Sequence, residues 1–249
     1  MNILAIGNSF SEDATRYLHA IAAAEGIYTR VVNLYIGGCS LERHAANLAS
    51  GERAYLMEYN GESSGFFCSI EEALGANDWD FVSLQQTSLE STDYARYQPY
   101  LGVMAEACRR SAPDAKLMIH QTWAYEEGSE RLRVRMGYET SAAMFADIRA
   151  CYDRAASEIA ADGIIPSGET VRLLAEAGLK PHRDTYHINK GFGRYALGLT
   201  WFAALTGADV TENGFADLDE EADGETLRLC RECAARAAAA YGWSGKRSL

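Results

Sequence analysis

The sequence predicts an α/β protein built as a three-layer α/β/α sandwich, in which helices cover both faces of a five-stranded parallel sheet. Short apolar segments with the composition of strands alternate along the chain with longer amphipathic segments. This alternation is typical of βαβ units, whose strands run parallel and whose helices pack on the sheet. No repeat, low-complexity tract or linker divides the sequence, so we expect one domain over residues 1–249.

The predicted elements follow one another in a regular order. Apolar and β-branched runs predict strands at Asn2–Ile6, Ile27–Leu34, Asp80–Leu84, residues 115–123 and from Gly163. Apolar residues at helical spacing predict helices around Asp13–Glu25, Ser40–Ala49, Tyr94–Ser111 and Thr140–Ala161, and from about Asn189. Gly26 and Pro113 follow two of these helices, and both residue types commonly end a helix.

Two segments depart from the alternation. Residues 51–70 are typical of a β-hairpin insertion, with Asn60 and Gly61 at its turn. Residues 123–139 form a long polar connection after the fourth strand. Because loops carry specificity on a rigid scaffold, we expect these two segments to select the substrate.

The composition excludes several classes of protein. The chain is 48% hydrophobic and 23% charged, as in soluble globular proteins. Its formal net charge of -12 argues against nucleic acid and anionic membranes as partners, because both attract clustered Lys and Arg. No apolar run reaches the roughly 18 residues of a membrane span, and residues 1–7 lack the basic start of a signal peptide. We therefore expect a cytoplasmic protein for the sequence as written, with export only if a signal has been removed. The oligomeric state stays open.

We expect neither a metal nor an organic cofactor. Cys230 and Cys233 have the spacing of half a metal site, but no second Cys pair or nearby His completes it. We interpret them as helix-packing residues, since free Cys commonly behaves as a small buried hydrophobe.

Small and polar residues follow the first four predicted strands. They are Gly7-Asn8-Ser9, Gly37-Gly38-Cys39-Ser40, Gln85-Gln86-Thr87-Ser88 and His120-Gln121-Thr122. Ligands of open parallel sheets bind outside the carboxyl ends of the strands. We therefore expect these four segments to converge on one site.

Ser9 is the first candidate for chemistry at this edge. It lies two residues beyond Gly7, where its hydroxyl would be exposed, and as a nucleophile it needs a His oriented by a carboxylate. The alternative is a helix cap, a role that Ser11 also fits because Glu12 and Asp13 follow it. A phosphate-binding loop is a poor interpretation, since "GNSFSEDA" lacks the GxxxxGK[ST] spacing and any Lys.

Asp184 and His187 are the second candidate. They stand three residues apart just before the helix predicted from about Asn189, where positions i and i+3 share a face. The carboxylate can accept the imidazole Nδ1–H and leave Nε2 free to act as a base. Together with Ser9 they give the chain order Ser, Asp, His.

"IGNSFS" near the start and "DTYHIN" much later resemble the SGNH (GDSL-like) hydrolase superfamily, which contains esterases, acetylesterases, lipases and thioesterases. The resemblance covers most of the chain and is closest to a bacterial branch whose third-strand motif reads like "WDFVSLQQTS". It implies a flavodoxin-like sandwich with Ser9 as nucleophile and with Asp184 and His187 completing the triad. It also implies that the backbone N–H groups of Ser9 and Gly38 contribute to an oxyanion hole.

The segment after the third predicted strand, which we call the third block, departs from the family pattern. The family usually has Gly-x-Asn-Asp there, and its Asn side chain donates to the oxyanion, whereas this chain has Gln85-Gln86-Thr87-Ser88. A Gln amide can donate the same N–H from one methylene further away. Because side chains alternate along a strand, Gln86 shares a face with Val82 and Leu84, and we name it before Gln85 as the donor.

Four further residues are candidate substrate contacts, namely Asn8, His120, Gln121 and Trp123. For His120 and Gln121 the alternative is that they only satisfy hydrogen bonds beneath the 123–139 connection. Trp123 could form an apolar wall of the site or a platform on which a sugar stacks, and the alternative is that it only packs inside the protein.

The sequence therefore predicts a serine esterase that hydrolyses short acyl esters. The resemblance implies acetyl groups on a small molecule or a glycan as the substrate. A carbohydrate-binding module with weak or no catalysis is the alternative, which the altered third block keeps open. The complete set of Ser9, Asp184 and His187 argues against it, since a pure binder has no need of a triad.

Overall fold

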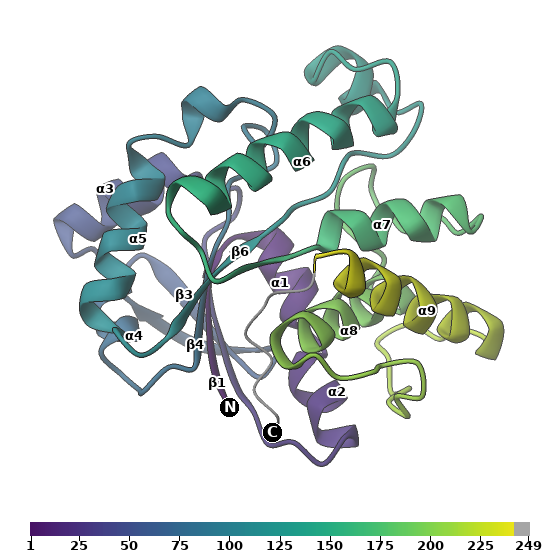
Figure 1. Ribbon diagram of the computed structural model, residues 1–249, viewed down its shortest axis with the longest axis horizontal. Helices are drawn as coiled ribbons and strands as arrows, with labels where there is room; N and C mark the ends of the chain where they lie inside the picture. Colours follow the sequence, from purple (N-terminus) through teal and green to yellow (C-terminus); the bar gives the residue numbers. More distant parts are fainter. Residues whose placement is uncertain (242–249) are drawn as a thin grey trace.

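A mixed β-sheet forms the centre of the protein in the computed structural model, which describes residues 1–241 (Figure 1). The strand order is β4-β3-β2-β1-β5-β6-β7. The strands are β1 (Asn2–Gly7), β2 (Arg30–Tyr35), β3 (Tyr55–Tyr59), β4 (Glu62–Cys68), β5 (Phe81–Leu84), β6 (Lys116–His120) and β7 (Gly163–Ile165). β1 lies in the middle and pairs with both β2 and β5, so the residues that follow it emerge at the centre of the sheet.

Five strands are parallel, as the sequence predicts: β2, β1, β5, β6 and β7. The sheet has seven strands within residues 1–241 rather than five, because the predicted hairpin adds β3 and β4 antiparallel to β2. At its turn Asn60 and Gly61 have φ angles of 51° and 85°. Two positive φ values are the requirement of the tight hairpin turn that Asn-Gly favours. A side chain on Gly61 would also collide with the carbonyl of Arg16, 2.0 Å from its Cβ position.

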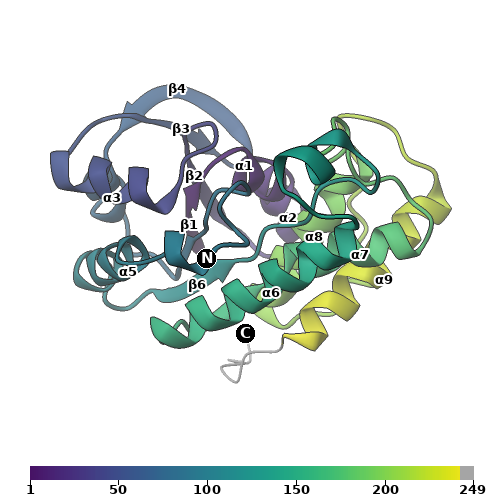
Figure 2. The same ribbon diagram turned by 90° about the horizontal axis from the view of Figure 1, so that it is seen from above.

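Helices cover both faces of the sheet, which confirms the three-layer sandwich (Figures 1 and 2). One layer holds α3 (Leu41–Ser50), α4 (Ile70–Leu74), α5 (Tyr100–Ser111) and α6 (Ser141–Glu158). The other holds α1 (Ser9–Thr15), α2 (Leu18–Ala24), α7 (Ser167–Glu176), α8 (Phe192–Thr206) and α9 (Gly224–Ala240). In the second layer α8 packs against α1, α2, α7 and α9, and so forms its centre.

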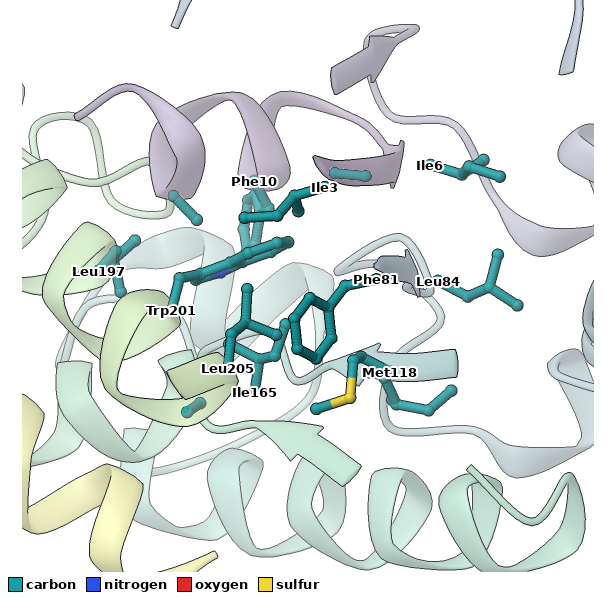
Figure 3. Close-up of a cluster of buried hydrophobic side chains, with 14 of the residues drawn as sticks. Ile3, Ile6, Phe10, Phe81, Leu84, Met118, Ile165, Leu197, Trp201 and Leu205 are labelled. Carbon is teal, nitrogen blue, oxygen red and sulfur yellow. The ribbon is translucent and has the colours of Figure 1, made fainter. Parts of the chain in front are cut away.

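Apolar side chains alternate between the two faces of the sheet. Ile3 and Phe81 point toward Trp201 of α8, whereas Ile6 and Leu84 lie on the opposite face (Figure 3). All five are buried. The strands therefore read as nearly continuous apolar runs, because both faces of a parallel sheet are covered.

Several predicted elements differ in their bounds. The helix predicted at Asp13–Glu25 is two helices, and the first begins earlier, at Ser9. The helix predicted at Tyr94–Ser111 is a 3₁₀ turn, η1 (Tyr94–Arg96), followed by α5. The 123–139 connection contains a short π-helix, η2 (Arg131–Arg135).

The one-domain prediction extends over residues 1–249, and its last eight residues lie outside the described part of the chain. Among the helices of residues 1–241, none has the length and apolar character needed to cross a membrane.

Candidate active site

Three hydrogen-bonded side chains meet at the carboxyl edge of the sheet. Ser9 Oγ lies 2.9 Å from His187 Nε2, and His187 Nδ1 lies 2.8 Å from Asp184 Oδ2. Ser9 is half-buried, and the side chain of His187 is 16% exposed. The structure thus brings together, within reach of solvent, the three residues that the sequence proposes as a triad.

The loop between α7 and α8 holds Asp184 and His187 in a tight turn. α8 begins at Phe192 rather than at Asn189, so the pair precedes the helix instead of lying on its first turn. Asp184 Oδ1 accepts the backbone N–H of His187 at 2.8 Å, and the backbone N–H of Arg183 donates to the carbonyl of His187 at 2.9 Å. The turn therefore places the carboxylate and the imidazole side by side without help from a helix.

The charge of Asp184 fixes the tautomer of His187. Burial alone would raise the pKa of Asp184, but hydrogen bonds from the ring and backbone of His187 and from the backbone of Tyr186 outweigh it, so this pKa lies below its usual range. Asp184 is therefore ionised at neutral pH and can only accept a hydrogen bond. The proton of the neutral imidazole then sits on Nδ1, and Nε2 presents its lone pair to Ser9.

Asn8, rather than Ser9 or Ser11, caps α1. Asn8 Oδ1 accepts the backbone N–H of Phe10 at 3.0 Å, and Ser11 Oγ accepts the backbone N–H of Asn8 at 3.1 Å. This reciprocal arrangement is a capping box, which leaves the Ser9 hydroxyl free for His187. Gly7 is required beside it, because a Cβ there would lie 2.4 Å from Ser11 Oγ.

Two backbone N–H groups that the sequence predicts as oxyanion donors belong to Ser9 and Gly38. Gly38 is exposed, has a φ of 62°, and stands in the turn after β2. The hydrogen bond from Asn8 Nδ2 to the carbonyl of Cys39, 3.1 Å long, ties this turn to the residue before Ser9. Within residues 1–241 neither the N–H of Gly38 nor that of Ser9 donates to another group. Unpartnered donors at a helix start and a glycine turn suit a developing negative charge.

The structure corrects the choice of Gln86 as a third donor. Gln86 is fully buried, its Oε1 accepts the backbone N–H of Leu41 at 3.0 Å, and its Nε2 donates to the carbonyl of Arg96 at 3.0 Å. The predicted alternation along β5 holds, since Gln86 shares the side of Leu84. That side carries α3 and α5, whereas α1, which begins with Ser9, packs against α8 on the other face (Figure 3).

Gln85 lies beside the nucleophile turn instead. Its Nε2 donates to Asn8 Oδ1 at 2.7 Å, and its Oε1 is 2.7 Å from His120 Nδ1. The N–H of Phe10 fixes Asn8 Oδ1 as an acceptor, so Gln85 must turn its amide nitrogen toward it. Gln85 thereby holds Asn8 in place, and one of its two N–H bonds is occupied in doing so.

The four predicted substrate contacts are packed inside the protein. Asn8, His120, Gln121 and Trp123 are 2%, 0%, 0% and 0% exposed. His120 Nε2 lies 2.9 Å from Ser167 Oγ, and burial lowers the pKa of His120 to about 3, so it is neutral. Gln121 Nε2 donates to the hydroxyl of Tyr241 at 3.0 Å. These residues lie behind the site rather than facing substrate, because their polar atoms make hydrogen bonds to other groups of the protein.

Aromatic residues that the sequence analysis does not single out surround the imidazole. The Tyr186 ring lies 3.9 Å from that of His187, and the Arg131 guanidinium lies 3.8 Å above the Tyr186 ring. Phe10 stacks on Trp123 at 4.0 Å, directly after the nucleophile in sequence. Phe10 directly follows Ser9 in "NSF", and Tyr186 directly precedes His187 in "DTYH". This adjacency to the predicted site residues could have identified both aromatic residues from the sequence.

A buried carboxyl group lies on β3 beside α1. Glu58 is 8% exposed and accepts a hydrogen bond from Asn33 Nδ2 at 2.7 Å. Burial raises the pKa of Glu58 to about 7, with a further increase from Glu12, although the Asn33 hydrogen bond opposes the shift. Asn33 Oδ1 has no hydrogen-bond partner within residues 1–241. β3 therefore carries, near the charges of Glu12 and Asp13 on α1, an acid whose pKa lies close to neutral pH.

Glu58→Gln is expected to stabilise the protein at pH 8 and to have a smaller effect at pH 5. The folded state keeps the Glu58 proton up to about pH 7, whereas the unfolded state releases it near 4.5, so wild-type stability falls as pH rises between these values. Gln cannot ionise, and its amide can donate to Asn33 Oδ1. We expect a gain of about 2–3 kcal/mol in unfolding free energy at pH 8, measured by urea denaturation at both pH values. Glu52→Gln, at an exposed loop position, is the control. An equal effect at pH 5 and pH 8 would contradict the assignment.

Within the described part of the chain, no three His, Cys, Asp or Glu side chains are grouped as a metal site. Cys230 and Cys233 are both buried in α9, and the Cys230 thiol contacts the carbonyl of Phe192 at 3.4 Å. They pack the helix, as the sequence analysis proposes.

The mostly parallel sheet covered by helices on both faces matches the fold of SGNH hydrolases. A candidate SGNH hydrolase from Slackia heliotrinireducens superposes with a TM-score of 0.57 at 21% identity, over 81% of this chain and 97% of its own. TesA superposes with a TM-score of 0.50 at 16% identity, over 80% of this chain and 93% of its own. The resemblance to the SGNH superfamily is confirmed for the fold.

The chain belongs to the family described as "Domain of unknown function (DUF4886)", whose model matches residues 2–237. A DUF4886 family protein from Bacteroides uniformis is 33% identical and superposes with a TM-score of 0.90, over 100% of this chain and 97% of its own. No curated protein sequence matches the chain.

Proposed function

We propose that this protein is a serine esterase that works through a covalent acyl-enzyme. The observation that carries the proposal is the continuous hydrogen-bond chain from Ser9 through His187 to Asp184. A serine hydroxyl becomes an effective nucleophile when a neutral imidazole accepts its proton and a carboxylate orients that imidazole. Here the hydroxyl, the imidazole and the carboxylate come from distant parts of the sequence and are hydrogen-bonded in that order.

In the first half of the reaction Ser9 Oγ attacks the ester carbonyl carbon, and its proton passes to His187 Nε2. The charge that develops on the carbonyl oxygen is stabilised by the backbone N–H groups of Ser9 and Gly38. Asp184 stabilises the imidazolium without taking its proton. The alcohol leaves with the proton from Nε2, and the acyl group stays on Ser9.

In the second half His187 removes a proton from water, which attacks the acyl carbonyl. The same two N–H groups stabilise the second tetrahedral intermediate. Collapse of this intermediate releases the carboxylic acid and returns the proton to Ser9. None of these steps requires a metal or an organic cofactor.

We propose a short acyl group, acetyl in the first instance, on a small molecule or a glycan. The support is the resemblance to a superfamily that contains acetylesterases, which is an argument by analogy. A binding module on the same fold remains the competing function for the test to separate.

The test is hydrolysis of p-nitrophenyl acetate, butyrate and octanoate by the wild-type protein, with fluorophosphonate labelling in parallel. We expect turnover that is fastest with acetate, and a single phosphonylated peptide that contains Ser9. Faster turnover of octanoate would contradict the short-acyl proposal while leaving the esterase intact. Absence of both hydrolysis and labelling would favour the binding module.

A further inference from the structure

We propose that Asp13 is a positioning residue that fixes the acid–base pair against the nucleophile. This inference rests on the proposed function, because it assigns a role toward Ser9 and His187. Asp13 is 0% exposed and lies on α1, four residues after Ser9. Residues at i and i+4 lie on the same side of a helix, so Asp13 sits one turn below the nucleophile.

Asp13 binds the residues on either side of the acid–base pair. Arg183, which precedes Asp184, donates from Nη1 to Asp13 Oδ1 and Oδ2 at 2.9 and 3.0 Å. Ile188, which follows His187, donates its backbone N–H to Asp13 Oδ2 at 3.2 Å. One carboxylate on the helix of the nucleophile therefore holds both ends of the turn that carries the base.

The turn is also closed at its base by its own chain. Arg183 Nη1 donates to the carbonyl of Ile188 as well as to Asp13, and the backbone N–H of Asn189 donates to the carbonyl of Pro181 at 2.7 Å. The turn is thus a small unit closed by its own hydrogen bonds.

Trp123 Nε1 and the backbone N–H of Glu126 hold the outer carbonyls of this turn at 2.7 Å each. Apart from the His187–Ser9 hydrogen bond itself, the side-chain hydrogen bonds between the turn and α1 within residues 1–241 are those of Asp13.

A second arginine completes the charge balance. Arg194 Nε donates to Asp13 Oδ1 at 2.8 Å, and its Nη1 lies 3.3 Å from Asp219 Oδ2. Asp219 also pairs with Arg16 at 2.7 Å. Two guanidinium groups and one backbone N–H compensate the buried charge of Asp13. If that charge is removed, Arg183 and Arg194 each lose an ion-pair partner.

Asp219 provides a matched control for the role of Asp13. Both carboxylates pair with Arg194, but within residues 1–241 Asp219 contacts no residue of the 183–188 turn. If both carboxylates only stabilise the fold, the two variants should differ in melting temperature, since Asp13 is 0% and Asp219 31% exposed, but neither should change kcat or the ring shifts of His187. A positioning role makes only Asp13 matter for the geometry of His187.

The experiment compares Asp13→Asn with Asp219→Asn in the full-length protein. With p-nitrophenyl acetate, we expect Asp13→Asn to lower kcat by about tenfold to a hundredfold while KM changes little, because misplacing a catalytic group by about 1 Å has effects of this size. Asp219→Asn should keep kcat within about twofold of wild type, because groups away from the chemistry act mainly on stability. Thermal denaturation measures stability separately.

A second readout needs no ester substrate. In protein labelled with ¹⁵N-histidine, His187 should show one protonated and one unprotonated ring nitrogen in the wild type and in Asp219→Asn, with the signals assigned through His187→Ala. In Asp13→Asn the Nδ1 shift should stay, because Asp184 still holds that proton, whereas the Nε2 shift should move to its value in Ser9→Ala, because the hydrogen bond between Ser9 and Nε2 is lost. A wild type that cleaves no ester would overturn the proposed function, while the NMR comparison would still decide the role of Asp13.

The proposal is overturned if Asp13→Asn lowers the melting temperature but keeps the wild-type kcat and the wild-type Nε2 shift. Should Asp13→Asn fail to fold, Arg183→Met takes its place. It removes the Arg183 bridge, leaves Asp13 paired with Arg194 and keeps the backbone N–H of Ile188 on Asp13, so a loss of kcat and a change of the Nε2 shift in the same direction are expected.

Discussion

Ser9→Ala and His187→Ala are each expected to lower kcat for p-nitrophenyl acetate on the order of 10⁴-fold. Alanine at position 9 removes the atom that forms the acyl-enzyme. Alanine at position 187 removes the only side chain within residues 1–241 that is hydrogen-bonded to Ser9 Oγ. Steady-state kinetics with active-site titration of the wild type measures both effects.

The double variant distinguishes a triad from two independent contributions. Groups that act as one unit have strongly non-additive effects, so Ser9→Ala/His187→Ala should be no slower than either single variant. All three proteins should keep the circular dichroism spectrum of the wild type, because Ser9 is half-buried and neither side chain fills the core. A Ser9→Ala variant with wild-type turnover would rule out the acyl-enzyme mechanism.

Trp123→Ala is expected to have the largest effect on stability, a loss of about 3–5 kcal/mol in unfolding free energy. Trp123 is fully buried, and its ring stacks on Phe10 with an interplanar angle of 6°. Truncation leaves a cavity beneath the first turn of α1. Because the Trp123 Nε1–H donates to the carbonyl of Tyr186 at 2.7 Å, the variant should also lose activity at temperatures where it remains folded.

Trp123→Phe separates the two contributions. It keeps an aromatic ring against Phe10 but leaves the Tyr186 carbonyl without its donor, at a cost of about 1–3 kcal/mol. Urea denaturation and ester hydrolysis should be measured on both variants. If Trp123→Ala were as stable as wild type but bound ester more weakly, the residue would be a substrate contact after all.

The layered fold and the triad follow from local signals in the sequence. Five parallel strands are visible because each is an apolar run between helical segments, and Asn60-Gly61 marks a hairpin turn by its backbone preference alone. Ser9, Asp184 and His187 stand out because they follow a strand or share a short motif. Each of these signals lies within a few residues.

The errors concern features that depend on packing between distant segments. Alternation along β5 correctly placed Gln86 with Leu84, but which face of the sheet carries Ser9 depends on where α1 packs. In the same way, His120 and Trp123 lie at the expected edge of the sheet, yet Ser167 and Trp201 enclose His120. Phe10 and the carbonyl of Tyr186 contact Trp123. The partners of Asp13 lie about 170 residues further along the chain, beyond any local pattern.

The hydrogen bond between Ser9 and His187 joins residues 178 positions apart. β1 is the first strand of the chain but the central strand of the sheet, so the nucleophile turn takes its final place only between β2 and β5. The base arrives still later, on a turn that follows every strand of the sheet. Closing so long a loop carries an entropy cost that only the contacts between these elements offset. During synthesis, a chain that has not yet reached position 187 therefore has no imidazole to accept the proton of Ser9, and the proposed nucleophile can be activated only after all seven strands of residues 1–241 have been made.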